Sequence, residues 1–277
     1  MDSKILCIGE SMKSLKSFLL ESLMVLGLLF PHAAFTQGPA EIRVYGPGGP
    51  APAMKEAAKT FEKKTGTPVM VTAGPTPEWI AHAKADADII YSGSETMMTD
   101  FAQAMEGGFD ETKAEPLYLR PLAILVRPGN PRKITGLADL FKPGHRVLVV
   151  NGAGQNGVWE DAAGRKGDIA SVRALRANIA KYAKNSALAR QDWINDPSLD
   201  AWIIWNIWQV ANPTLADVVP IESEYAIYRD TGIVATKKGE TNPAVMEFIA
   251  FVKSADGAAI FQRWGWLAGS GKGKQNK

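Results

Sequence analysis

The sequence predicts an α/β protein of two lobes, and three observations lead to this fold class. From residue 41 onward, short apolar β runs alternate with helical segments, which is the pattern of βαβ units. The run 88–91 (DIIY) is nearly all apolar, as expected for a strand buried on both faces of a parallel sheet. Two longer β runs, 117–127 and 225–236, enter and leave the middle of the chain, and we interpret them as crossings between the lobes.

The N-terminal part of the mature chain shows this alternation most clearly. Apolar residues, among them Met54, Ala57 and Phe61, recur at helical spacing within 53–65, and Gly66 is suited to end that helix. The other elements predicted here are strands over 42–45, 69–72 and 88–91, a glycine-rich turn over 46–50 and a helix over 78–84.

The remainder of the chain continues the pattern with longer β runs. The predicted strands cover 117–127, 146–150, 200–205, 218–221 and 225–236. The predicted helical segments are 136–140, a helix starting near Val158, 169–181, 185–193, 245–253 and 257–264.

Two crossings predict a discontinuous first lobe. Lobe I is expected over 41–119 plus 230–268, and lobe II over 120–229. Lobes joined by a paired hinge are typical of proteins that close around a ligand. The tail 269–277 is rich in glycine and lysine, and we expect it to be disordered.

Residues 1–36 have the features of an export signal peptide. Lys13 and Lys16 form a positive segment before the apolar run 23–30, which is too short to span a bilayer. The alternative, a buried N-terminal helix, is favoured only by Glu21 within the apolar stretch. The single cysteine, Cys7, lies in this segment, so the mature chain is expected to be a periplasmic protein without disulfides that is not embedded in the membrane.

The composition argues against several classes of protein. The 31 basic and 29 acidic residues give a formal charge of +2, which does not suggest a nucleic-acid-binding protein. His32, His82 and His145 have no carboxylate or cysteine at ligand spacing, so no metal site is predicted. The common hydrolase and P-loop motifs do not occur, and we expect neither enzymatic activity nor a cofactor. The G-x-G-x-x-G spacing in 152–157 leaves dinucleotide binding as a weak alternative.

Glycine-bearing loops follow several of the predicted strands. In open α/β sheets, ligands bind at the carboxyl ends of the strands, where the loops 46–50, 74–79, 92–95 and 152–157 are expected to lie. Backbone N–H groups uncovered by glycine, at the start of a helix, can bind an oxyanion. The alternative is that these glycines only make tight turns.

Side chains near these loops complete the candidate ligand-binding site. Ser94 and Asn185 precede helices, so either residue could cap a helix or contact an anion, while Arg120 and Arg229 lie on the two crossings. Trp205 ends a predicted strand, although core packing is the default role of a tryptophan. The candidate ligand-binding residues are Gly46, Pro47, Gly48, Gly49, Thr76, Trp79, Ser92, Gly93, Ser94, Arg120, Gly152, Ala153, Gly154, Gly157, Val158, Asn185, Ser186, Trp205 and Arg229.

Several motifs of the mature chain resemble one known family. The strings VYGPGGP, DIIYSGSE, LYLRPLAILVRPGNP, GVWEDAAGR and DAWIIW are together similar to the accessory colonization factor AcfC family. The resemblance implies the type II periplasmic-binding-protein fold of molybdate and sulfate receptors, with each lobe a mostly parallel sheet flanked by helices.

The resemblance also implies a function. The expected ligand is a small sulfated, phosphorylated or carboxylated anion, taken up through an ABC transporter permease or sensed through a chemoreceptor. Related proteins are known as dimers and as surface adhesins. A homodimer, and an adhesin whose cleft is vestigial or structural, therefore remain the alternatives.

Overall fold

The computed structural model describes residues 41–268. The predicted signal peptide, 1–36, and the predicted tail, 269–277, lie outside the described residues. The first half contains β1 (Ile42–Gly46), α1 (Ala51–Thr65), β2 (Val69–Ala73), α2 (Thr76–Asp86), β3 (Ile89–Tyr91), α3 (Glu95–Ala104), η1 (Glu111–Lys113), β4 (Glu115–Val126) and η2 (Leu137–Phe141). The second half contains β5 (Val147–Val150), α4 (Val158–Gly164), α5 (Ile169–Asn178), β6 (Ile179–Ala183), α6 (Ser186–Asn195), β7 (Ala201–Trp205), α7 (Ile207–Ala211), β8 (Asp217–Pro220), η3 (Ser223–Tyr225), β9 (Tyr228–Ala235), η4 (Gly239–Thr241), α8 (Pro243–Lys253) and α9 (Ala255–Arg263).

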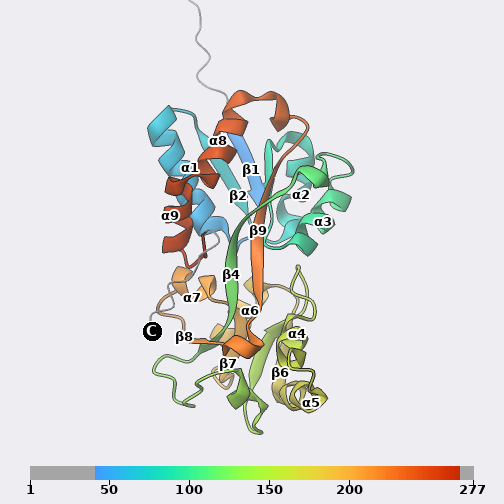
Figure 1. The fold of residues 1–277 in the computed structure, drawn as a ribbon, viewed down its shortest axis with the longest axis vertical. Helices are drawn as coiled ribbons and strands as arrows, with labels where there is room; N and C mark the ends of the chain where they lie inside the picture. The colour runs from blue at the N-terminus through green and yellow to red at the C-terminus, as the bar shows by residue number, and fades with distance from the viewer. Residues whose placement is uncertain (1–40, 269–277) are drawn as a thin grey trace, which may run out of the picture. The chain divides into compact units, whose positions relative to one another are not determined.

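The strands pair in the order β2-β1-β3-β9-β4-β7-β5-β6, and β8 pairs with β4. β1 is parallel to β2 and β3, and β5 is parallel to β6 and β7. The long strand β4 belongs to both groups, because Glu115–Pro121 pairs with β9 and Leu122–Val126 pairs with β7. Figure 1 shows β4 and β9 side by side at the centre of the described chain. The lobe boundaries that we expect from the sequence stay a prediction.

The core forms where the apolar runs pack against helices. All five residues of β7 and all four of β5 are buried, as expected for strands covered on both faces. α1 buries Met54, Ala57 and Phe61 on one face, and its C-cap Gly66 has a left-handed φ of 76°. Within residues 41–268, no helix combines the length and the apolar character needed to cross a bilayer.

One predicted helix is wrong over its last residues. The helix expected over 169–181 ends at Asn178, and residues 179–183 form β6, which is parallel to β5. The side chain of Asn178 is buried, and its Nδ2 donates to the carbonyl oxygens of Leu140 (2.8 Å) and Lys142 (2.6 Å). Because these tertiary contacts fix the end of the helix, the local sequence pattern does not reveal it. The β run expected over 225–236 also begins later, since residue 225 lies in η3.

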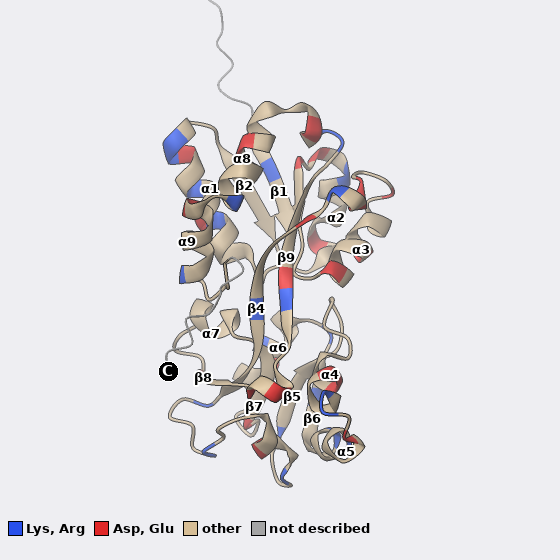
Figure 2. Ribbon diagram, viewed as in Figure 1, with Lys and Arg blue, Asp and Glu red and all other residues tan. Residues whose placement is uncertain are grey.

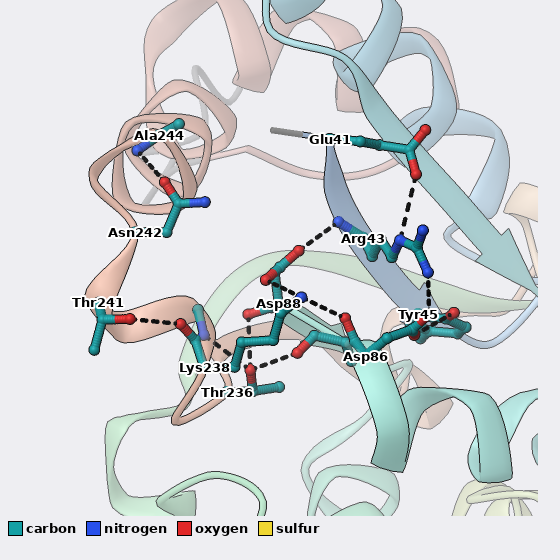
Figure 3. Close-up of polar contacts among 12 residues, drawn as sticks. Glu41, Arg43, Tyr45, Asp86, Asp88, Thr236, Lys238, Thr241, Asn242 and Ala244 are labelled. Atoms are coloured by element: carbon teal, nitrogen blue, oxygen red, sulfur yellow. Dashed lines mark hydrogen bonds and ion pairs between the residues drawn. The ribbon is translucent and has the colours of Figure 1, made fainter. Parts of the chain in front are cut away.

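Polar contacts hold the start of β1 to the segments beside it (Figure 3). Asp88 is 3% exposed; its Oδ2 accepts from the backbone N–H of Arg43 (2.8 Å), and its Oδ1 lies 2.8 Å from Lys238 Nζ. Tyr45 donates its hydroxyl proton to Asp86 (2.7 Å), and burial together with this carboxylate raises the pKa of Tyr45 to about 12. This network joins β1 to the segment that follows β9, and it is structural.

Candidate functional site

A cavity of about 110 Å³ lies among the loops at the carboxyl ends of several strands. Its lining residues lie at or after the ends of β1, β2, β3, β5, β6 and β7, and one of them, Arg120, lies on β4. The lining residues are Pro47, Gly48, Gly49, Pro50, Gly74, Pro75, Thr76, Gly93, Met97, Arg120, Ala153, Gly154, Gln155, Asn185, Ser186, Ala187, Trp205 and Trp208.

The N-termini of four helices are at this cavity. α1 starts after Pro50, α2 after Pro75, α3 two residues after Gly93, and α6 after Asn185. The caps of α1 and α2 are prolines, which make no side-chain cap hydrogen bond. A helix N-terminus carries unpaired N–H groups and a partial positive charge, and each favourable anion contact contributes about 0.3–1 kcal/mol. The cavity is therefore surrounded by weak positive potential from the backbone.

Arg120 is the only lysine or arginine in the cavity lining, and it is 5% exposed. Its Nη2 donates to the carbonyl oxygen of Gly93 (2.5 Å) and its Nη1 to that of Asp230 (3.4 Å). No ion pair within 4.0 Å joins Arg120 to a carboxylate among residues 41–268. Burial lowers the pKa of Arg120, while the carboxylate of Asp230, although it makes no ion pair with Arg120 within 4.0 Å, raises it. The site thus holds a buried cation that lacks a close counter-charge.

Two buried donors in the lining residues lack a partner among the described residues. They are Arg120 Nε and the indole Nε1 of Trp205. Buried donors in native proteins are nearly always hydrogen-bonded, and within residues 41–268 the indole N–H of Trp202, outside the lining, is unpartnered in the same way. Figure 2 shows basic and acidic residues spread over the helices and loops of the described chain, with no extended area of one sign in this view. Any preference for an anion is therefore local to the cavity.

The structure brings together residues from all the loops predicted from the sequence. The predicted residues that line the cavity are Pro47, Gly48, Gly49, Thr76, Gly93, Arg120, Ala153, Gly154, Asn185, Ser186 and Trp205. The predicted residues that do not line it are Gly46, Trp79, Ser92, Ser94, Gly152, Gly157, Val158 and Arg229.

Three of the predicted residues outside the lining make hydrogen bonds within the part of the fold that contains β1, β2 and β3. Trp79 is 1% exposed and donates its indole N–H to the carbonyl of Gly74 (3.2 Å). Ser92 is fully buried, and its Oγ accepts from the backbone N–H of Gly232 (3.1 Å). Ser94 is the N-cap of α3, and its Oγ accepts from the N–H of Met97 (3.1 Å). These side chains shape the site by holding its backbone in place.

The other predicted residues outside the lining have structural roles as well. Gly46 ends β1 against the ring of Tyr91, and Gly152 lies close to the backbone of Lys184. Gly157 caps α4 with a φ of 72°, and Val158 is buried in the core. Arg229 pairs with Asp161 (3.4 Å) and is not in the lining.

Seven lining residues were not among the predicted site residues. They are Pro50, Gly74, Pro75 and Gln155, which lie in loops that were expected at the site, and Met97, Ala187 and Trp208. Gln155 lies inside the predicted loop 152–157, and its Nε2 donates to Ser186 Oγ (2.8 Å), so the polar side chain within the glycine run was the available signal. Met97 follows the predicted loop 92–95 by two residues, and no local signal distinguishes it from a core methionine.

Replacing Gly154 with alanine is expected to weaken ligand binding about tenfold. A Cβ at this position would lie 2.9 Å from Ser94 Oγ and 3.2 Å from Met97 Cβ, so the loop would be pushed away from α3. Gly157→Ala is the matched control, because Gly157 has a similar φ of +72° but nothing within 4 Å of its Cβ. Calorimetry on both variants checks this, and equal affinities of the two would contradict it.

A carboxyl pair lies beside the cavity. Glu95, the first residue of α3, is hydrogen-bonded to Asp230, and this contact, together with burial and the charges of Asp230 and Glu111, raises the pKa of Glu95 to about 7. The pKa in the folded state is therefore above that of an unperturbed glutamate. Below the ordinary pKa of a glutamate, Glu95 is protonated in both the folded and the unfolded state, so the carboxyl pair does not lower the free energy of unfolding there. Between the ordinary pKa of 4.5 and the folded-state pKa of about 7, the unfolded state loses the proton of Glu95 while the folded state keeps it, so the stability of the fold decreases over this range and is constant above it.

Glu95→Gln is therefore expected to stabilise the protein, relative to the wild type, increasingly from pH 4.5 to about pH 7 and by a constant amount above that. The thermal midpoint of the variant minus that of the wild type should grow across this range. A difference that stays constant with pH would contradict the assignment.

The chain belongs to the family of bacterial extracellular solute-binding proteins, whose model matches residues 42–267. It is similar to L-phospholactate-bound PEB3, with 37% identity and a TM-score of 0.78, and to Peb3 from Campylobacter jejuni, with 36% identity and a TM-score of 0.77. Both similarities cover 82% of this chain and 100% of the other. None of the curated proteins matches the chain.

Proteins of lower sequence identity share this fold. The sulfate-binding protein SubI from Mycobacterium tuberculosis is similar with a TM-score of 0.66 at 16% identity, over 84% of this chain and 88% of that one. The protein thus has the two-lobed type II periplasmic-binding-protein fold, with helices flanking a mixed sheet. The fold class expected from the sequence is confirmed.

Proposed function

We propose that the protein binds a small organic anion in the cavity around Arg120. The observation that carries this proposal is the buried guanidinium without a carboxylate partner. A buried charge without a close ion-pair partner is costly, and a bound anion would supply one beyond the more distant carboxylate of Asp230. The four helix N-termini and the unpartnered Trp205 N–H would add to the same attraction.

The size and the lining of the cavity favour an organic anion over an inorganic one. The cavity of about 110 Å³ is several times the volume of about 10–15 Å³ that one water needs, so it has room for a ligand of several non-hydrogen atoms. Trp205, Trp208 and Met97, with three prolines, offer apolar surface to a carbon skeleton. PEB3, which is bound to L-phospholactate in one solved structure, supports a phosphorylated carboxylate as the ligand.

The proposal includes a role outside the cytoplasm. A protein of this family would hand its ligand to an ABC-type importer or a chemoreceptor, and the expected signal peptide would direct it to the periplasm. Binding without turnover is proposed, since the matched family is one of solute-binding proteins. Within that family, the motifs noted in the sequence support a place in the accessory colonization factor AcfC group.

Titration calorimetry with L-phospholactate tests the proposal. Micromolar affinity requires about 8 kcal/mol, which a few charge-assisted hydrogen bonds of about 1.5–3 kcal/mol each can supply after the ordering costs are met. Sulfate and L-lactate, which carry only part of the ligand, should bind at least about tenfold more weakly. Absence of binding by L-phospholactate, or equal binding of sulfate, would refute the proposed class of ligand.

A further inference from the structure

Two indole rings contact the Arg120 guanidinium. Its Cζ lies 4.7 Å from the centroid of the Trp205 ring and 4.8 Å from that of the Trp266 ring. Trp205 ends β7, whereas Trp266 lies in the segment that follows α9. Three segments far apart in the sequence therefore meet at one guanidinium.

Trp266 is held firmly in this position. It is 2% exposed, and its backbone N–H donates to the carbonyl of Phe261 (3.1 Å). On one side, the carbonyl of Gly265 accepts from Asn206 Nδ2 (2.7 Å). On the other side, Leu267 exchanges two backbone hydrogen bonds with Leu119, the residue before Arg120. The backbone on both sides of the indole is thus fastened to the elements that surround the cavity.

Contact with aromatic rings has a defined effect on a guanidinium. The five N–H groups of arginine lie in the plane of the fork, so a ring that packs on a face leaves the edge of the fork free for hydrogen bonds. A ring face attracts the cation without neutralising it, and most strongly where water is excluded. The two rings therefore favour the charged form of Arg120 and restrict its position, and the carbonyls of Gly93 and Asp230 fix the direction of two of its N–H groups.

We propose that Trp266 is a positioning residue of the anion site, because its indole, together with that of Trp205, packs on the Arg120 guanidinium and restricts where that cavity-lining group can lie. This inference rests on the proposed function. Trp266 does not line the cavity and acts through Arg120.

A second stacked pair in the same protein provides a control. Arg127 lies 3.7 Å from the centroid of the Trp193 ring, but its Nε, Nη1 and Nη2 donate to the carbonyls of Leu199, Trp193 and Asp196 at 2.6–3.0 Å. All its nitrogens are satisfied by the protein, and Arg127 is not in the cavity lining. Arg127 is therefore stacked on a tryptophan, as Arg120 is in contact with one, but it is not part of the cavity.

The test is calorimetry with L-phospholactate on Trp266→Leu, Trp266→Phe and Trp193→Leu, together with the thermal midpoint of each. Trp266→Leu should weaken binding about tenfold or more, and Trp266→Phe, which restores a ring face, should stay within about threefold of the wild type. Trp193→Leu should lower the thermal midpoint and leave the affinity unchanged. Should Trp266→Leu not fold, Trp266→Met fills the space with a flexible apolar chain and should weaken binding as much.

The outcomes separate the two proposals. Wild-type affinity in Trp266→Leu or Trp266→Met would overturn the positioning role, and so would an equal loss of affinity in Trp193→Leu. Failure of Trp266→Phe to recover binding above the leucine variant would also overturn it. No binding of L-phospholactate by the wild type would instead refute the proposed function, and the positioning role would fall with it.

Discussion

Replacing Arg120 with methionine is expected to weaken the binding of L-phospholactate about 100-fold. A charge-assisted hydrogen bond to the anion contributes about 1.5–3 kcal/mol, and about 2.7 kcal/mol corresponds to a factor of 100. The stability of the ligand-free protein should fall by no more than about 2 kcal/mol, because removal of a desolvated charge offsets part of the loss of two hydrogen bonds to the carbonyls of Gly93 and Asp230. Calorimetry and thermal unfolding measure the two effects separately.

Arg127→Met is the matched control for that experiment. Arg127 donates three hydrogen bonds to backbone carbonyls, so its loss should lower the stability by a few kcal/mol and leave the affinity of the folded protein unaltered. A strong loss of stability in Arg120→Met with undiminished affinity would show that Arg120 is a structural residue. The buried charge would then need another explanation.

Gly46→Ala is expected to destabilise the fold by about 3 kcal/mol. A Cβ at Gly46 would lie 2.5 Å from the carbonyl oxygen of Tyr91 and 2.6 Å from its ring, and Tyr91 is fully buried. Neither the backbone nor a packed ring can move away without disturbing the pairing of β1 with β3. Denaturant unfolding measures the difference.

The control for Gly46 lies two residues along the same turn. A Cβ at Gly48 would have nothing within 4 Å, so Gly48→Ala should leave the free energy of unfolding within about 0.5 kcal/mol of the wild type. Equal stabilities of the two variants would show that close packing on Tyr91 does not explain the glycine at position 46.

The glycine turn 46–50 shows how far the sequence predicts the site. The turn was expected at the end of a strand and it does line the cavity, because strand ends and glycine runs are local signals. The distinction between Gly46, which packs on Tyr91, and Gly48, which faces the cavity, is not local. Position in the tertiary structure decides which glycine packs against a neighbouring strand and which lines the cavity.

Arg120 could be predicted from the sequence, whereas its contact with Trp266 could not. Arg120 was predicted because it lies on a β run that was interpreted as a crossing, and the pairing of β4 with both β9 and β7 is consistent with that interpretation. Nothing around Trp266 marks it, since its contact with Arg120 depends on the pairing of Leu267 with Leu119. The strand β6 was missed for a similar reason, because β5 and the contacts of Asn178 determine it.

A crystal structure of the protein grown with L-phospholactate tests the account most directly. We predict that a phosphate or carboxylate oxygen of the ligand lies about 2.7–2.9 Å from a nitrogen of the Arg120 guanidinium, within the cavity bounded by Trp205 and the starts of α1, α2, α3 and α6. A ligand bound elsewhere, with the Arg120 guanidinium still lacking an anionic partner, would contradict it.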